Sequence, residues 1–218
     1  MCVSFVPLPR AELAGHFQAE PPPDQWAAEV WQDDLAPIIL PGDQARQAVL
    51  ANYGFLPRQQ QAPGARYSTL NARAETIDRL ISYRQAWQQC QLCLVPMRGF
   101  YEPCYESGRA ERFQIGLLDD APFAVAGLWR SWRTPAGSTE YAFTQITINA
   151  DQHPLMRRMH QPGEEKRSLV IIPATHYDAW LDCQVPQRAR QWLQLYPADA
   201  MQARPLPKPP TPQLALPF

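Results

Sequence analysis

The stretch from residue 92 to residue 149 constrains the fold more than any other part of the chain. It is a succession of short runs rich in aromatic and β-branched residues, several of them bounded by Gly or by pairs of Asp. Such runs are typical of β-strands joined by turns. The strands predicted in this stretch are 92–95, 100–105, 113–118, 123–129 and 141–149. The sequence therefore predicts a domain built mainly on an antiparallel sheet.

The rest of the chain adds elements around this sheet. The Gln- and Pro-rich segment 57–65 indicates a surface loop. Further strands are predicted at 35–40, 49–56 and 168–172. Helices are predicted at 9–17, 74–87, 174–181 and 187–195. We expect an α+β fold, a single domain over residues 1–196 with a curved, largely antiparallel sheet or partly closed β-barrel flanked by helices.

The C-terminal segment differs in composition from the rest of the chain. Residues 197–218 are rich in proline, which favours an extended conformation and cannot build a core. We predict a proline-rich tail that begins close to Tyr196.

Composition excludes several classes of protein. The chain of 218 residues has 45% hydrophobic and 19% charged residues, which suits a globular domain, and it holds no apolar run long enough to span a membrane. No signal peptide is recognisable, and the five cysteines are odd in number and irregularly spaced. We expect reduced thiols, a monomer, no membrane partner and a cytoplasmic location.

Charge is distributed unevenly along the chain. The formal net charge is -1, but residues 1–45 hold seven acids against one arginine, which leaves about +5 for the remainder. All cations except Lys166 and Lys208 are arginines. The planar guanidinium group suits phosphate and stacks on bases, although a compositional bias toward arginine explains the same count.

Cys2 is the most suggestive single position. Removal of Met1 would leave a terminal residue with an amine and a thiol side by side. An α-amine has a pKa near 8, so part of it is neutral and nucleophilic at pH 7, and the thiol at about 8.5 is partly ionised. Together they can condense with an aldehyde through a Schiff base to a thiazolidine ring. The alternative is an incidental cysteine at position 2.

Three further segments carry candidate chemistry. In the segment 70–76, Asn71 could position an amine and Arg73 could hold a phosphate, while helix capping is the alternative. Glu102 lies in an apolar and aromatic strand, which raises a carboxyl pKa and suits acid–base work unless the side chain faces solvent. His160 lies in a basic cluster at 156–167 and could shuttle protons, although a solvated loop is the commoner meaning of such a cluster.

No metal site or cofactor is predicted. Cys90 and Cys93 have the spacing of a zinc-binding pair, but a structural site needs two more ligands at regular spacing, and only Cys104 is close in sequence. We expect two small thiols that bind no metal.

Cys2, the segments Asn71-Ala-Arg-Ala-Glu-Thr and Gly99-Phe-Tyr-Glu, and Arg157-Arg-Met-His resemble, in order and approximate spacing, the SOS response-associated peptidase (SRAP) family of the YedK type. The resemblance spans about residues 2–182. It implies a single mixed α/β domain that binds single-stranded DNA at abasic sites and attaches to them through Cys2. It also implies a peptidase that processes its own N-terminus, and a lyase side activity when the Schiff base undergoes β-elimination.

The resemblance also assigns roles. Cys2 would be the nucleophile, Asn71 would hold the amine or the sugar, Glu102 would be the acid–base group, and His160 would assist proton transfer. Val3-Ser4 replaces the usual Gly-Arg after the cysteine, so other DNA contacts are expected. The candidates, which combine phosphate-binding arginines with two stacking aromatic residues, are Arg73, Tyr53, Phe55, Arg58, Arg98, Arg157, Arg158 and Arg167.

Two other classes of protein remain open at this point. One is an N-terminal-nucleophile amidohydrolase, similar to a glutamine amidotransferase domain, in which Cys2 uses its own α-amine as the base. The other is a DNA-binding module without catalysis, in which Cys2 is incidental.

Overall fold

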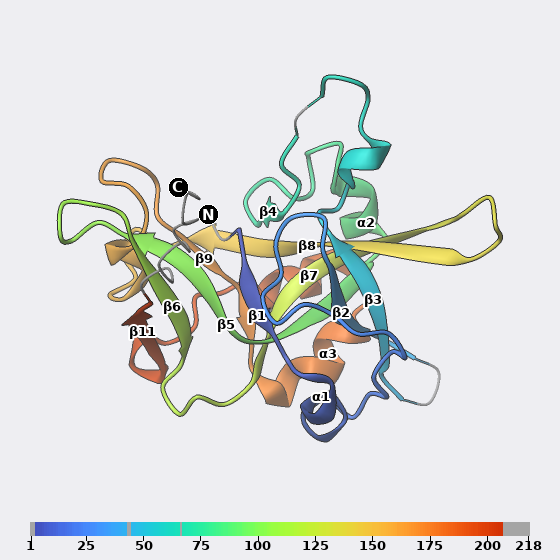
Figure 1. The fold of residues 1–218 in the computed structure, drawn as a ribbon, viewed down its shortest axis with the longest axis horizontal. Helices are drawn as coiled ribbons and strands as arrows, with labels where there is room; N and C mark the ends of the chain where they lie inside the picture. Colours follow the sequence, from blue (N-terminus) through green and yellow to red (C-terminus); the bar gives the residue numbers. More distant parts are fainter. Residues whose placement is uncertain (1–2, 43–44, 66, 207–218) are drawn as a thin grey trace, which may run out of the picture.

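A mixed β-barrel organises the molecule. The computed structural model describes residues 3–42, 45–65 and 67–206 (Figure 1). Five strands close the barrel: β7 pairs with β8, β8 with β3, β3 with β2, β2 with β5, and β5 returns to β7. Of these five barrel pairings, only β3–β8 is parallel. The barrel strands are β2 (Leu35–Leu40), β3 (Gln47–Tyr53), β5 (Leu92–Cys104), β7 (Phe123–Arg133) and β8 (Thr139–Asn149).

Six further strands extend this barrel in the described part of the chain. β1 and β6 pair with β5, β11 pairs with β6, β4 and β9 flank β8, and β10 pairs with β7. Their bounds are β1 (Phe5–Pro7), β4 (Asn71–Arg73), β6 (Glu111–Leu117), β9 (Arg167–Leu169), β10 (Ile171–Ile172) and β11 (Met201–Pro205). The prediction of an α+β domain with a curved, partly closed sheet flanked by helices is confirmed.

Helices cover one side of the barrel wall. They are short, and several continue into or from 3₁₀ turns. Their bounds are α1 (Arg10–Phe17), α2 (Arg84–Gln88), α3 (Tyr177–Leu181) and α4 (Pro186–Ala189), with 3₁₀ turns η1 (Arg58–Gln60), η2 (Met156–Arg158), η3 (Ala174–His176), η4 (Arg190–Trp192) and η5 (Ala198–Ala200). In Figure 1, α1 and α3 lie below the barrel, and the long β7–β8 hairpin projects from the body.

Two apolar cores explain why the barrel strands are apolar along their whole length. Successive side chains of a strand point to opposite faces. Leu94 packs into the core under the helices, whereas its neighbour Val95 packs into the barrel interior, and Ile39 and Ile38 divide in the same way. Both faces of these strands are therefore buried, which produces continuous apolar runs instead of an alternation.

Aromatic rings fill the barrel interior. Tyr53 stacks on Phe143 with ring centroids 5.2 Å apart, and Phe5 of β1 meets Tyr53 edge-on at 5.3 Å. Gly127 allows a close approach of the wall strands, because a Cβ there would lie 2.7 Å from Sγ of Cys93. β1 is thus anchored by Phe5, immediately after the first described residues.

The predicted helix at 74–87 is wrong over most of its length. Asn71–Arg73 forms β4, the following residues form successive turns, and only Arg84–Gln88 is α-helical. The Ala74 amide donates to the carbonyl of Thr147, which ties the segment to β8. Apolar residues in this segment do not share one face, since Ile77 is buried while Ile81 is 83% exposed. Tertiary contacts with β8 override the local helical propensity.

Other boundaries also shift. The runs predicted as separate strands at 92–95 and 100–105 form the single strand β5, and β3 ends at Tyr53 because Gly54 adopts φ 130°. The helix predicted at 187–195 divides into α4 and η4. The segment after Tyr196 was expected to lie outside the core, but Met201–Pro205 pairs along β6 and Met201 is buried. Edge pairing with β6 supplies the hydrogen bonds that composition does not reveal.

Truncation tests where the folded domain ends. Burial of a Met side chain contributes roughly 1.5–3 kcal/mol, and 1 kcal/mol moves Tm by roughly 2–4 °C in a chain of this size. We expect a chain that ends at Tyr196 to melt at least about 4 °C below one that ends at Leu206, by calorimetry. Equal melting temperatures would restore the boundary near Tyr196.

Candidate functional site

Glu102 is a buried carboxyl group on β5. It lies between Phe100 and Cys104, and because side chains alternate along a strand, all three point to the same side of the sheet. Only 3% of Glu102 is exposed. Burial penalises the charged form and raises the pKa of Glu102 to about 8. At neutral pH this residue is therefore mostly a protonated carboxylic acid.

His160 is brought to Glu102 by the loop that follows η2. Met159 bridges to Cys104, and the His160 amide donates to the carbonyl of Pro103 at 2.7 Å. His160 itself has φ 63°, a left-handed backbone conformation. Residues other than glycine seldom adopt it, and those that do are often found at functional sites. The result is a distance of 3.3 Å between Nδ1 of His160 and Oε2 of Glu102.

The other ring nitrogen defines the protonation of this pair. Nε2 of His160 lies 3.0 Å from the carbonyl oxygen of Arg167, and since a carbonyl only accepts, Nε2 carries the hydrogen. Burial lowers the pKa of His160 to about 4, so the ring is neutral at pH 7 and Nδ1 is an acceptor. The Nδ1 lone pair therefore faces the protonated carboxyl group of Glu102. The buried pair holds one proton that can be transferred.

The N-terminal strand runs beside this pair. Phe5 is opposite Phe100 on β5, and the Tyr101 amide donates to the carbonyl of Ser4 at 3.1 Å. Ser4 is therefore adjacent to the backbone that precedes Glu102. Cys2, the predicted nucleophile, lies outside the described residues.

Asn71 belongs to the neighbouring strand β4. It is half-buried, lies opposite Gln145 of β8 in a parallel register, and its carbonyl accepts a hydrogen bond from Tyr83 Oη at 3.3 Å. Gln145 in turn accepts from Tyr53 Oη at 3.2 Å. Because β4 and β9 both pair with the last part of β8, Asn71 and the strand after His160 are attached to the same support.

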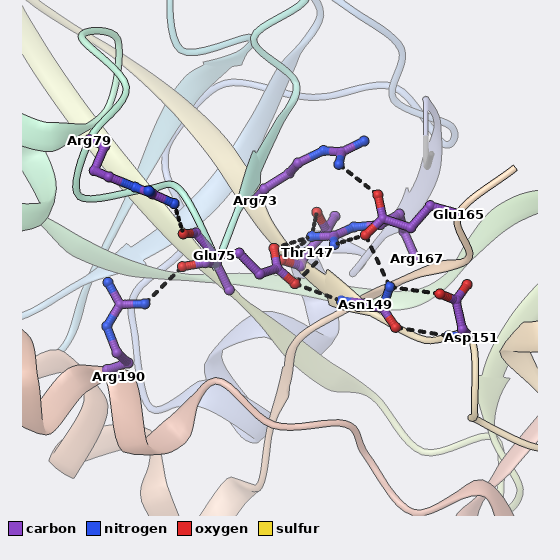
Figure 2. A network of polar contacts seen from close by, with 10 residues as sticks. Arg73, Glu75, Arg79, Thr147, Asn149, Asp151, Glu165, Arg167 and Arg190 are labelled. Atoms are coloured by element: carbon purple, nitrogen blue, oxygen red, sulfur yellow. Dashed lines mark hydrogen bonds and ion pairs between the residues drawn. The ribbon is translucent and has the colours of Figure 1, made fainter.

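Arg167 is the centre of an ionic network (Figure 2). Its side chain is 2% exposed, and both terminal nitrogens are held by Glu75, by Glu165 and by the carbonyl of Thr147, at 2.8–2.9 Å. These contacts occupy both terminal nitrogens of a buried guanidinium group that DNA cannot reach, so the predicted phosphate contact by Arg167 is wrong. The network instead secures the segment whose carbonyl orients the His160 ring.

The same network extends to the surface. Arg73 of β4 pairs with the outer oxygen of Glu165 at 2.6 Å and keeps a side chain that is 45% exposed. Asn149 donates to Glu165 and to Asp151. Hydrogen bonds from Asn149 and Arg167 lower the pKa of Glu165, which therefore stays ionised at neutral pH. Arg73 remains reachable from solvent at the edge of the network (Figure 2).

A basic cavity of about 740 Å³ opens beside His160. Arg158 is held bidentately by Glu106, and Lys166 donates to the carbonyls of His160 and Gln161. Arg157 is exposed on the rim of the cavity, and no acidic partner for it is seen among the described residues. The residues that line the cavity are Tyr105, Glu106, Pro154, Arg157, Arg158, His160, Pro162, Gly163 and Lys166.

Four other predicted DNA contacts lie elsewhere in the structure. Tyr53 is fully buried and Phe55 is 4% exposed, so neither offers a face to a base, and both predictions are wrong. Arg98 is tied to Glu12 of α1 and to the carbonyl of Asp120. Arg58 pairs with Asp33 and lines separate surface hollows.

Sequence reasoning missed the partners in the ionic network. Glu75 lies in the segment 70–76 and Glu165 in the basic cluster 156–167, but 90 residues separate them and no local pattern links them. Glu106, which holds Arg158, and Arg112 of β6 were likewise not predicted as site residues. A buried arginine can be recognised only once its long-range carboxylate partners are known.

The described residues include no recognisable group of metal ligands and no helix that could span a membrane. They contain no cluster of three or more His, Cys, Asp or Glu that could hold a metal ion, and Cys90, Cys93, Cys104 and Cys183 are free thiols. None of the described helices has both the length and the apolar character needed to cross a bilayer.

The fold and the site define a single-domain mixed β-barrel protein with a buried carboxyl–imidazole pair next to its N-terminal strand. Residues 1–209 match the family model described as SOS response associated peptidase (SRAP), and the chain belongs to that family.

Relatives and solved structures agree with this placement. Abasic site processing proteins YoqW and YoaM of Bacillus subtilis are each 30% identical over 173 residues, which cover 78% of this chain and 73% and 72% of theirs. A crystal structure of a Bordetella bronchiseptica protein superposes with a TM-score of 0.83 at 34% identity, covering 94% of this chain and 99% of that one. A Bacteroides thetaiotaomicron protein shares the fold, with a TM-score of 0.74 at 20% identity and coverage of 94% and 92%.

The role of Arg167 can be tested by its removal. Breaking a buried ion pair from one side costs roughly 3–5 kcal/mol, because the partner charges are left uncompensated. We expect Arg167→Met to lower the free energy of unfolding by about that amount in guanidinium titrations. Arg157→Met, an exposed control, should change it by less than about 0.5 kcal/mol. Weaker DNA binding by Arg167→Met at unchanged stability would contradict a structural role.

The Glu102 pKa predicts a dependence of stability on pH. The folded carboxyl titrates at about 8 and the unfolded one near 4.5, so between these values the folded state retains a proton that the unfolded state has lost. The contribution of Glu102 to stability is complete below pH 4.5 and is lost as pH rises to 8. His160, whose pKa is lowered, contributes its stability in full above 6.5.

Only Glu102 of the pair therefore acts between pH 6.5 and 8, with a slope of up to about 1.4 kcal/mol per pH unit. We expect the free energy of unfolding to fall less steeply over this window in Glu102→Gln than in the wild type, measured by denaturant titration at several pH values. Equal slopes would mean that Glu102 is ionised at neutral pH.

Proposed function

We propose that this protein captures abasic sites in single-stranded DNA covalently, through a thiazolidine formed by Cys2 after Met1 is removed. The observation that carries the proposal is the buried, neutral Glu102–His160 pair next to the N-terminal strand. An amine that condenses with a sugar aldehyde needs a group that both donates and accepts a proton, and this pair supplies one at neutral pH.

The substrate is supported by the relatives. The proteins YoqW, YoaM and YobE of Bacillus subtilis, each 30% identical to this chain, are named abasic site processing proteins. An abasic deoxyribose is the one unit of DNA that can open to an aldehyde. The same carbonyl is what a terminal amine and thiol can trap together.

Chain connectivity supports Cys2 as the trapping residue. Ser4 lies against Tyr101, next to Glu102, and Cys2 is two residues before Ser4. Two residues of extended chain span at most about 7 Å, so the terminal amine of Cys2 can lie no further than that from Ser4. This short connection supports Cys2 as the residue that reacts beside the pair.

The reaction proceeds in two bond-forming steps. The neutral amine of Cys2 attacks the C1′ aldehyde, and the carbinolamine loses water to give a Schiff base. The thiolate of the same residue then adds to the imine carbon, and the nitrogen takes up a proton as the five-membered ring closes. One water molecule is released overall, and no oxidant or cofactor is required.

Glu102 and His160 handle the protons in these steps. The closed sugar opens when its ring oxygen receives a proton, and the carbinolamine hydroxyl must be protonated to leave as water. Protonated Glu102 can supply both. The Nδ1 lone pair of neutral His160 faces the protonated carboxyl group, and the same pair acts in reverse when the ring is reopened.

DNA is bound by groups around the pair that are at least partly exposed. Asn71 on β4 holds the amine or the sugar, and Arg73 and Arg157 contact flanking phosphates from the edge of the ionic network and the rim of the basic cavity. A buried acid–base pair requires the abasic sugar to be free of a paired strand, which favours single-stranded DNA over duplex.

Side activities follow from the same intermediate. When the thiol does not close the ring, the Schiff base can lose the 3′ phosphate by β-elimination, which is a lyase activity. Removal of Met1, by the protein itself as a peptidase, would expose the amine. A monomer is sufficient, because every proposed group comes from one chain.

Crosslinking tests the proposal directly. Incubated with single-stranded DNA that carries one abasic site, the wild type should form an adduct that survives heating in denaturing gels. Cys2→Ala should form none, because no ring can close, and Cys2→Ser should form one only after borohydride reduction. Glu102→Gln should slow adduct formation by roughly 10²–10⁴-fold, the usual contribution of a general acid.

The controls separate the alternatives. DNA with an intact base should give no adduct, and mass spectrometry should show Met1 absent from the reactive protein. A wild type that forms no adduct but releases ammonia from glutamine would overturn the proposal in favour of an amidohydrolase.

A further inference from the structure

Arg112 lies on the outer face of β6, behind the N-terminal strand. β6 pairs with the end of β5, where Arg112 is opposite Pro103 and Phe113 is opposite Glu102. Because side chains alternate, Arg112 points away from the side on which Glu102 meets His160. It is not part of the acid–base pair or of the basic cavity beside His160.

Four groups surround the guanidinium of Arg112. Its central carbon lies 3.5 Å from the ring centroid of Tyr101 and 5.7 Å from that of Trp31. Glu29 forms an ion pair with it. The same nitrogen that binds Glu29 donates to Oγ of Ser4 at 3.3 Å. Arg112 therefore links the residue two positions after Cys2 to the side chain that precedes Glu102.

The N-terminal strand is short. β1 is three residues long, and Phe5 is held by Phe100 on one side and by backbone hydrogen bonds with Val30 on the other. Before Phe5, Ser4 is 1% exposed, and its carbonyl accepts from the Tyr101 amide while its hydroxyl accepts from Arg112. The contact with Arg112 ties the side chain of Ser4 to β6.

We propose that Arg112 is a positioning residue for the reaction at Cys2, which acts by clamping Ser4 against Tyr101 so that the terminal amine is held beside Glu102. The inference rests on the proposed function and names a group that does not touch the substrate. Cys2 precedes β1 in the chain whereas Glu102 is on β5, and misplacement of reacting groups by about 1 Å can cost about 100-fold in rate.

The chemistry of Arg112 favours a clamp over a phosphate contact. The guanidinium is stacked on Tyr101 and neutralised by Glu29, and its side chain is 28% exposed, less than the 45% of Arg73. A planar fork can stack on a ring and donate to two acceptors at once, which an ammonium group cannot do. The contacts described here use both properties.

Single-turnover crosslinking separates positioning from binding. The rate of adduct formation is measured against the concentration of abasic single-stranded DNA, which gives a maximal rate and a half-saturating concentration. For Arg112→Ala we expect a maximal rate roughly 10- to 100-fold lower, with the half-saturating concentration changed less than about twofold. Arg112→Lys, which keeps the charge without the planar stack, should fall between Arg112→Ala and the wild type.

Arg46 provides a matched control. It likewise covers a tyrosine ring, with its central carbon 5.5 Å from Tyr177, pairs with Asp178, and donates to a carbonyl, that of Phe17. Arg46→Ala removes the same kinds of contact away from β1. It should lower the melting temperature without lowering the maximal rate of crosslinking.

Ser4→Ala tests the link itself. It removes the hydroxyl acceptor and leaves the Arg112–Glu29 ion pair and the stack on Tyr101 in place. If Arg112 acts through Ser4, a variant that combines Ser4→Ala with Arg112→Ala should form the adduct no more slowly than Arg112→Ala alone. Should Arg112→Ala fail to fold, Ser4→Ala and Arg112→Lys carry the test, with reduced maximal rates expected for both.

The outcomes are distinguishable from those for the proposed function. A wild type that crosslinks, together with Arg112 variants of unchanged maximal rate, overturns the positioning role and leaves Cys2 capture intact. A raised half-saturating concentration with an unchanged maximal rate makes Arg112 a DNA contact and also overturns it. A wild type that forms no Cys2 adduct overturns both proposals.

Discussion

The close contact between the Glu102 carboxyl group and the His160 ring, 3.3 Å from Oε2 to Nδ1, is the interaction around which the candidate site is organised. It is buried, so neither group can exchange its partner for water, and burial moves the two pKa values in opposite directions, to about 8 and about 4. Both groups are consequently neutral at physiological pH. An acid with its proton in place and a base with its lone pair in place are the pairing that reversible carbonyl chemistry requires.

Keeping this pair in place demands support from several parts of the fold. His160 takes a left-handed backbone conformation, and its ring is oriented by the Arg167 carbonyl. Arg167 is in turn secured by Glu75 and Glu165. On the other face of the sheet, Arg112 connects β6 to the N-terminal strand. One arginine thus supports the segment that orients His160 and another contacts the residue before β1, and both are held by carboxylates of the protein.

The extent to which the sequence predicts the fold depends on the range of the interactions involved. Runs such as Leu35–Leu40 were recognised because β-branched and apolar residues leave a local signature that strands share. The segment after Asn71 was not, because its turns follow from the Ala74–Thr147 hydrogen bond and the Glu75–Arg167 ion pair, partners more than 70 residues apart. Met201–Pro205 was missed for the same reason, since an edge strand needs a partner strand and little else.

For the candidate site, the sequence alone determined the kinds of chemistry available: a carboxyl group in an apolar strand, a histidine among cations, and a cysteine after the initiator methionine. Only the tertiary structure decided which of these groups meet. In the folded chain His160 lies next to Glu102, and Tyr53 and Phe55 are buried in the core. Arg167, predicted as a phosphate contact, is the centre of an internal network of ion pairs. The physical reason is that residue type sets what a side chain can donate or accept, whereas its pKa and its partners depend on burial and on contacts between distant segments.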